Sequence, residues 1–393
     1  MMGMMHTWYG GLLVMIFCSY LIAKACDIFE AATDYLGRNL NEGVKGATLN
    51  AIGSSLPELL TTVFFLVFAV QGELGRDLAA SIGGDTGSAI FNSIVIPMLI
   101  IWFVLASGIV GIGISRKVIL RDGLFLIGAE LILLVLLSSD YITHWHGWVF
   151  TIYYLIYLSY TLFFMSKSEE RDEGDSDEER ETWFEKFLFK TQEGRTGRSL
   201  LLFAAAVSFI ALACAGLVEG CKGIADSLQI HPLFVALILV AAASSVPDTI
   251  ISVKDAKKGN YDDALSNVLG SNIFDITISM GLPLAIFLLF TNQKIHFVES
   301  SKILIDVRIM LLIITSITIA IYYFNKKMGW KHVAWLGVLY GFFIVYSIGA
   351  SLYYSGDSSL LSSFSGTFIE FLHQEGGVSD TLRSMANSIT GSW

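Results

Sequence analysis

Long apolar runs recur along most of this chain, and they constrain its fold more than any other feature. The sequence is 54% hydrophobic and 15% charged, whereas soluble domains have about 25% charged residues. A helix of about 20 apolar residues crosses a hydrocarbon core about 30 Å thick. Because the runs are continuous and do not alternate with polar residues, they exclude a membrane β-barrel. The sequence therefore predicts an all-α polytopic membrane protein.

The runs predict ten membrane spans, which a charged segment divides into two sets of five. We expect a first transmembrane repeat at 1–165, an acidic loop at 166–198, a second repeat at 199–354 and a polar tail at 355–393. The first apolar run lacks the basic region of a signal peptide, so we expect it to remain as a span. The expected spans are 9–28, 44–70, 78–108, 119–139, 147–165, 199–226, 231–256, 262–291, 304–324 and 333–354.

Basic residues are unevenly divided between the connections that join these spans. If the N-terminus lies outside, 19 of the 25 Lys and Arg residues fall in or beside cytoplasmic connections and 6 fall outside. Cytoplasmic loops of membrane proteins carry such an excess of Lys and Arg. We therefore expect both termini outside and the acidic loop in the cytoplasm, in a multi-pass protein of a plasma or inner membrane. The lipid bilayer is then an expected partner, and we expect no nucleic acid and no cofactor.

One short motif with an acid inside an apolar span occurs in both halves of the chain. AIGSSLPE at 51–58 aligns without gaps with AAASSVPD at 241–248, and GSAIFN at 87–92 aligns with GSNIFD at 270–275. An ionised side chain at bilayer depth costs about 2.5–3.5 kcal/mol, so such acids are functional candidates. The two copies lie on spans that run in opposite directions. Inverted repeats with interrupted helices are typical of secondary transporters, so we predict two inverted five-helix repeats.

The residue types in both motifs favour oxygen ligation of a hard cation. Residues three, four and seven apart on a helix share one face, which places the serines of each motif on the same side as its acid. Pro57 and Pro247 cannot donate a hydrogen bond, so they free the backbone carbonyls of Gly53 and Ala243. Calcium and sodium prefer such oxygen atoms, whereas thiolate-seeking metals do not. A single serine in a span often bonds only to a carbonyl one turn back, but the duplication argues against that interpretation.

These motifs resemble the paired alpha-repeats of the calcium/cation antiporter superfamily, the sodium/calcium exchangers. In this chain the alpha-repeats cover about 44–108 and 231–291. GSNIFD at 270–275, followed by Ile-Thr, is most similar to the potassium-dependent branch, in which an aspartate at this place is linked to potassium. The resemblance implies a transporter and not an enzyme. It implies exchange of calcium for sodium by alternating access, with potassium carried together with the calcium.

The resemblance also implies which residues bind the transported ions. The implied ligands are the side chains of Glu58, Asn92, Asp248 and Asp275, the hydroxyls of Ser54, Ser55, Ser88, Ser244, Ser245 and Ser271, and the carbonyls of Ala51 and Ala241. One calcium ion and one potassium ion would balance the charge of the three acids. The chain departs from the family pattern at Ala243, where a glycine is usual, so we expect a tighter helix break there. It also has 34 residues from Glu58 to Asn92, against 27 between the corresponding acids of the second half.

Three other functions stay open at this point. A proton/calcium exchanger, or another divalent-cation exchanger, is the nearest alternative, because carboxylates in a dry cavity can also carry protons. An intramembrane aspartyl protease would use Asp248 and Asp275 as a pair that shares one proton. Each of these acids has a counterpart in the other half, and such duplication suits an ion site better than a catalytic dyad. A passive channel is the third, and dependence of flux on a cation on the opposite side would separate it from an exchanger.

Overall fold

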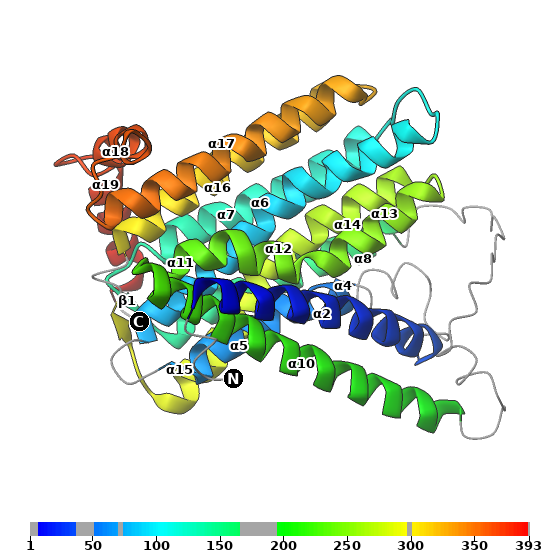
Figure 1. Ribbon diagram of the computed structural model, residues 1–393, viewed down its shortest axis with the longest axis horizontal. Helices are drawn as coiled ribbons and strands as arrows, with labels where there is room; N and C mark the ends of the chain where they lie inside the picture. Colours follow the sequence, from blue (N-terminus) through cyan, green and yellow to red (C-terminus); the bar gives the residue numbers. More distant parts are fainter. Residues whose placement is uncertain (1–6, 37–50, 70–73, 166–194, 297–300, 392–393) are drawn as a thin grey trace.

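The computed structural model describes residues 7–36, 51–69, 74–165, 195–296 and 301–391. These residues form a bundle of long helices that pack side by side (Figure 1). Within that part of the chain, the only strands are β1 (Tyr141–Ile142) and β2 (Ile295–His296), which pair antiparallel at one end of the bundle.

The helices of the two halves follow one another in the same order, as a repeat requires. The first half contains α2 (Trp8–Leu36), α4 (Ala51–Ser54), α5 (Leu56–Val67), α6 (Leu74–Ala106), α7 (Arg116–Leu136) and α8 (His144–Met165). The second half contains α10 (Arg195–Leu228), α11 (Pro232–Val235), α12 (Ala241–Ser244), α13 (Val246–Lys257), α14 (Tyr261–Phe274), α15 (Met280–Thr291), α16 (Ser301–Phe324) and α17 (Trp330–Tyr354). Two π-helical segments, η2 (Ala236–Val240) and η3 (Asp275–Ser279), join α11 to α12 and α14 to α15.

Each expected span coincides with a helix or with a broken helix. Six described helices are long and apolar enough to cross a membrane, and the bent pair Pro232–Ser244 and Val246–Lys257 makes a seventh. Three expected spans remain. Two of them are α7 and α8, of 21 and 22 residues, and the third is the second span, of which 44–50 lies outside the described residues. A helix of 21 residues is about 32 Å long, so α7 also reaches across a hydrocarbon core. The all-α polytopic fold with inverted repeats is therefore confirmed, while most of the acidic loop, 166–194, lies outside the described residues.

The helix break that the prolines predict occurs in both repeats, at the second serine of each motif. Ser55 separates α4 from α5 with φ −96° and ψ 9°, and Ser245 separates α12 from α13 with φ −78° and ψ 5°. Pro57 and Pro247 then lie in the first turn of the helix that follows, where a missing N–H costs nothing. The segments on the two sides of Ser245 are bent by 43°.

The difference between Gly53 and Ala243 has a packing cause. A Cβ at Gly53 would lie 2.5 Å from Cε1 of Phe29, so the aromatic ring from α2 occupies the space of a side chain there. Ala243 is 7% exposed and belongs to an apolar cluster with residues of α2 and α10. Because the backbone angles at Ser55 and Ser245 are similar, the expected tightening of the second break is not observed.

The first helices of the two repeats, α2 and α10, pack against each other along their length (Figure 1). Small residues line their contact, since a Cβ at Gly11 would lie 2.8 Å from the carbonyl of Gly220, and one at Gly216 would lie 2.6 Å from the sulfur of Cys18. Small residues let membrane helices approach closely. The apolar cluster that joins α2 and α10 also includes residues of α5, α6, α11, η2 and α12, and it is separate from the main cluster around α6, α14 and α16.

Arg308 is one of the six basic residues that the count of Lys and Arg assigned to the outside, but it does not lie in an outer connection. Its side chain is 1% exposed inside the bundle. The guanidinium donates hydrogen bonds to the carbonyls of Leu304, at 2.7 Å, and Leu133, at 2.9 Å. Leu133 lies in the last turn of α7, and its carbonyl also accepts the backbone N–H of Leu137 at 3.2 Å. Arg308 therefore closes the end of α7, and it is not evidence for the orientation of the chain.

The tail that was expected to be polar forms two further helices, α18 (Leu360–Leu372) and α19 (Val378–Thr390). Both lie at one end of the bundle (Figure 1), where α18 packs on α17 and α19 on α7. His373 contacts the carboxylate of Asp306 in α16 at 2.8 Å, and Asn387 donates to Asp140 at 2.9 Å. Because these polar contacts join residues far apart in the sequence, the periodicity of the tail alone did not reveal them.

The contact between α6 and the broken helix of the second repeat depends on a glycine. A Cβ at Gly87 would lie 2.0 Å from the carbonyl oxygen of Leu237 in η2 and 2.8 Å from Cβ of Ala241. Side chains cannot approach backbone so closely. Gly87 therefore brings α6 near the second helix break.

We predict that Gly87→Ala lowers the free energy of unfolding by about 1–3 kcal/mol or more, the usual cost of overpacking. Gly84→Ala on the same helix is the control, because its Cβ would lie 3.8 Å from the nearest atom, Cγ1 of Val240. Thermal unfolding of the purified protein in detergent compares the two variants. Equal unfolding temperatures would show that α6 and η2 can separate without cost.

Candidate cation site

The two helix breaks, the middle part of α6 and the junction of α14 with η3 meet inside the bundle. Glu58 lies in the first turn of α5, and Asp248 lies in the first turn of α13. Both acids therefore sit at helix N-termini, where the helix dipole stabilises negative charge. Asp275 is the first residue of η3. We call the side chains of Glu58, Asp248 and Asp275, together with the hydroxyl, amide and carbonyl groups around them, the central site.

Three carboxylates of the central site lie close together without a basic partner. Glu58, Asp248 and Asp275 each offer one oxygen within 4.8 Å of the others, and each side chain is at most 1% exposed. None of the ion pairs found among the described residues involves these acids. Buried like charges repel strongly at such distances. The arrangement is therefore suited to bind cations.

Ser88 lies at the middle of the hydrogen-bond network and joins both repeats. Its hydroxyl oxygen lies 3.3 Å from Oε1 of Glu58, 3.1 Å from Oδ2 of Asp275 and 2.9 Å from the hydroxyl of Ser245. A hydroxyl has one proton to donate and two lone pairs. Ser88 therefore cannot donate to both carboxylates at once, and at least one carboxylate oxygen is left for a cation.

The acid of the second repeat is held by residues of both repeats. Ser271 donates to Oδ1 of Asp248 at 2.7 Å, and Asn92 donates to Oδ2 at 3.2 Å. Ser54 also interacts with Asp248, and Ser244 interacts with Glu58. The first serine of each motif thus serves the acid of the other motif, as expected for two antiparallel copies that face each other.

Several oxygen atoms of the central site have no hydrogen-bond partner. They are Oε2 of Glu58, Oδ1 of Asn92 and Oδ1 of Asp275. A buried polar atom without a partner costs about 1–3 kcal/mol. Calcium takes six to eight oxygen ligands, with carboxylates prominent among them. The unpartnered oxygens, together with the hydroxyls nearby, therefore fit a hard cation as the transported substrate.

The resemblance implies two backbone carbonyls as ligands, those of Ala51 and Ala241, and the structure describes them to different extents. Ala241 already accepts two hydrogen bonds at its carbonyl, from the hydroxyl of Ser244 at 3.3 Å and from the N–H of Ser245 at 3.1 Å. An ion would have to replace one of them. Ala51 begins α4, and its side chain is outside the described part of the chain. Ligation by these two carbonyls stays a prediction.

Two buried residues near the central site were not singled out from the sequence. Asn272 donates to the carbonyl of Ala89 at 3.0 Å and to the hydroxyl of Ser93 at 2.8 Å, which ties α14 to α6. Asp85 lies on α6, three residues before Ser88, and is 4% exposed. Its signal in the sequence was an acid inside an expected span with no acidic counterpart in the second half.

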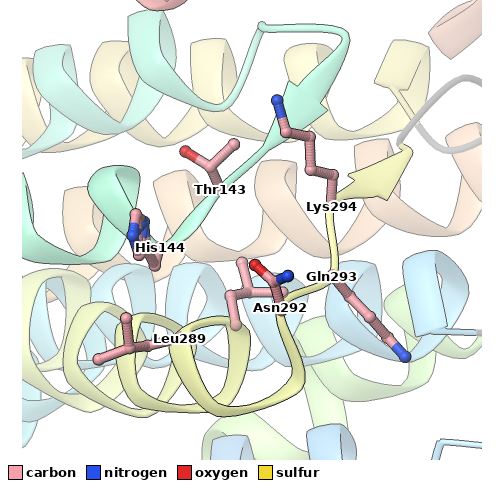
Figure 2. Close-up of a pocket in the computed structure, with 7 residues that line it drawn as sticks. Thr143, His144, Leu289, Asn292, Gln293 and Lys294 are labelled. Carbon is pink, nitrogen blue, oxygen red and sulfur yellow. The ribbon is translucent and has the colours of Figure 1, made fainter.

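The pocket drawn in Figure 2 is a different feature from the central site. It is lined by Thr143 and His144 at the start of α8 and by residues 288–289 and 292–294 around the end of α15. None of these residues carries a carboxylate, and Lys294 adds a positive charge. This pocket is therefore no candidate for cation binding.

We predict that calcium stabilises the protein through the acids of the central site. Added calcium should raise the unfolding temperature of the parent protein, because a ligand that binds only the folded state adds to its stability. Glu58→Gln or Asp248→Asn should abolish this shift. Glu130→Gln is the control, since Glu130 is a buried acid of α7 that is only 1% exposed and lies outside the central site. A calcium shift that survives in both site variants would contradict the assignment.

Comparisons with known proteins agree with this geometry. The family described as "Sodium/calcium exchanger protein" matches residues 10–163 and 198–349. An uncharacterized membrane protein of Methanocaldococcus jannaschii is 28% identical over 322 residues, which are 81% of this chain and 91% of that protein. The human sodium/potassium/calcium exchanger 5 is 37% identical over 114 residues, and the bovine sodium/potassium/calcium exchanger 1 is 30% identical over 153 residues. These matches cover 29% and 38% of this chain but 22% and 12% of the relatives' own lengths.

Solved structures of exchangers share the fold. A proton/calcium exchanger has a TM-score of 0.66 and 17% identity, with 97% of this chain and 92% of that chain covered. The sodium-calcium exchanger NCX_Mj has a TM-score of 0.53 and 24% identity, with 86% and 99% covered. The family consists of membrane transporters, so the protease alternative is set aside. The match over both repeats shows that this chain belongs to the sodium/calcium exchanger family of multi-pass membrane proteins that exchange cations, calcium among them.

Proposed function

We propose that this protein is a secondary antiporter that exchanges calcium for sodium and carries potassium together with calcium. The observation that carries the proposal is the group of three mutually close, buried carboxylates with hydroxyl and amide neighbours. Hard cations bind such oxygen sets. The proposed ligands are the side chains named from the sequence in both motifs.

The charge of the central site supports both halves of the exchange. Ionised Glu58, Asp248 and Asp275 carry −3, which one calcium and one potassium ion neutralise. Sodium ions can neutralise the same carboxylates in their place, so calcium and sodium compete for one set of oxygens. A site with unbalanced charge is costly in a low-dielectric interior. The protein therefore switches access from one side of the membrane to the other readily only when the site holds cations. This requirement couples the two fluxes.

The residue that favours potassium is Asp275. Its counterpart in the first repeat is Asn92, which supplies an amide in place of a carboxylate. An aspartate at both places would add a further charge, and an asparagine at both would remove the one that potassium balances. The relatives named sodium/potassium/calcium exchangers support the same assignment.

The helix pair α2–α10 is proposed to move against the rest of the bundle during alternating access. Ion pairs join this pair to the other helices near both of its ends. Lys222 of α10 contacts Asp77 of α6 at 3.0 Å, and Asp27 of α2 lies 4.0 Å from Lys254 of α13. Ion pairs between partly exposed side chains, such as Asp27 with Lys254, can break and re-form at modest cost. They would open one end while the other stays closed.

The orientation of the protein is also a proposal. The excess of Lys and Arg in one set of connections supports outside termini and a cytoplasmic acidic loop. Plasma and inner membranes are the proposed locations. Two transmembrane repeats, at 1–165 and 199–354, remain the proposed division of the chain.

Proton/calcium exchange is the second candidate. The solved proton/calcium exchanger shares this fold, and carboxylates that lack a basic partner can carry protons in place of sodium. This candidate differs from the first only in the driving ion. A transport experiment therefore separates them.

We expect vesicles that contain the protein and are loaded with sodium to take up calcium when diluted into sodium-free medium. Added external potassium should increase this uptake, because potassium completes the charge balance with calcium. Radioactive calcium measures the flux. Uptake driven by a pH gradient without any sodium would instead support the proton exchanger. Uptake with no counter-cation on the opposite side would indicate a channel.

Asp275→Asn should remove the potassium response and leave part of the calcium exchange. The variant keeps two carboxylates, which a single calcium ion balances. Uptake into sodium-loaded vesicles is measured over a range of potassium concentrations, with Glu130→Gln as the control that should respond as the parent does. An unchanged potassium curve in Asp275→Asn would refute the role given to this carboxylate.

A further inference from the structure

A stripe of polar residues extends along α6 from the central site toward one end of the bundle. Asp77, Ser81 and Asp85 follow one another at intervals of four residues, and Ser88 of the central site comes next. Residues at this spacing share one face of a helix. Thr62 of α5 stands opposite, since its hydroxyl donates to Oδ2 of Asp85 at 3.3 Å and accepts from Ser81 at 2.9 Å.

Asp85 is a buried acid whose position the fold does not require to be acidic. It is 4% exposed, and its counterpart in the second repeat is Val268, which is 0% exposed. The same place in the other repeat is thus filled by an apolar side chain. An acid at membrane depth costs about 2.5–3.5 kcal/mol on insertion scales. A carboxylate that the architecture does not need, and that is costly to bury, indicates a function.

The charge of Asp85 is not balanced by a basic residue. In the described part of the chain, Asp85 forms no ion pair, and its Oδ1 accepts no hydrogen bond. The basic group at the end of the stripe is Lys222, but Lys222 pairs with Asp77. Asp77 lies about 12 Å from Asp85 along α6. Asp85 interacts electrostatically with Glu58 and Asp275, so it adds to the negative potential of the central site. A cation is the partner that is missing.

We propose that Asp85, Thr62 and Ser81 form a separate cation station, which holds an alkali-metal ion one helical turn from the central site on the side of Lys222 and Asp77. The proposal rests on the exchange function given above and adds a site to it. One carboxylate with two neutral hydroxyls carries −1, which matches a monovalent ion. Calcium prefers more oxygen ligands and several carboxylates, so it is expected to pass on to the central site.

Among the described residues, the corresponding positions of the second repeat do not form such a station. There Ser252, the counterpart of Thr62, accepts a hydrogen bond from Asn267 at 3.0 Å. Asn267 and Val268 are both uncharged. A cation that enters along α5 and α6 therefore meets the Asp85 carboxylate just before the central site, whereas the corresponding residues of α13 and α14, Ser252 and Val268, are uncharged. The station makes the two entrances chemically different.

The test is equilibrium binding of radioactive sodium to the purified full-length protein in detergent. Asp85→Val copies the residue that the fold accepts in the second repeat. The affinity of this variant for sodium should fall by well over tenfold at one site. At a sodium concentration just sufficient to saturate the parent, it should therefore bind about one sodium ion fewer per chain. Calcium binding at the central site should persist.

Thr62→Val is the second variant, because it removes a hydroxyl without changing the size of the side chain. It should weaken sodium binding at the same site while the charge of Asp85 stays. Glu130→Gln removes a buried acid elsewhere in the bundle and should bind sodium as the parent does. If Asp85→Val and Thr62→Val both bind as much sodium as the parent, with equal affinity, the station does not exist. This assay measures binding and needs no transport. Its result can therefore be interpreted even if the vesicles show no sodium/calcium exchange.

Discussion

The repulsion among three buried carboxylates is the constraint on which the rest of this structure depends. Glu58, Asp248 and Asp275 place oxygens within 4.8 Å of one another in a dry interior. At an effective dielectric constant of 20, two unit charges about 5 Å apart interact by about 3 kcal/mol. No basic side chain in the described residues relieves this cost. Bound cations would relieve this repulsion, and the hydroxyls and helix N-termini around the acids favour cation binding.

Breaks in two helices bring these acids together, and close packing holds the breaks in place. Ser55 and Ser245 leave the helical conformation at matching points, so each acid begins a new helix that points at the site. Gly87 lets α6 touch the backbone of η2, and Gly53 leaves room for the ring of Phe29. Without these contacts the donors from the two repeats would lie too far apart for a shared network.

The two repeats share a plan but differ at two positions in and beside the central site. Asn92 corresponds to Asp275, and Asp85 corresponds to Val268. Perfect symmetry would give both entrances the same charge and both halves of the site the same ligands. The first difference gives the central site three carboxylates, and the second places a further carboxylate, Asp85, beside it. The two ends of an exchanger face solutions of different composition, and unlike entrances suit that situation.

Local features of the sequence are enough to predict the ten spans, the inverted repeat and the oxygen-rich character of the site. These follow from apolar length, from a motif written twice, and from proline, all of which are local properties of the chain. The three-dimensional packing adds that Arg308 donates to the end of α7, that the tail docks as α18 and α19, that the Ala241 carbonyl already accepts hydrogen bonds, and that Asp85 faces Thr62. Each of these depends on which side chains meet across the bundle. Contacts such as Asn92 with Asp248, 156 residues apart, arise from packing that no local pattern encodes.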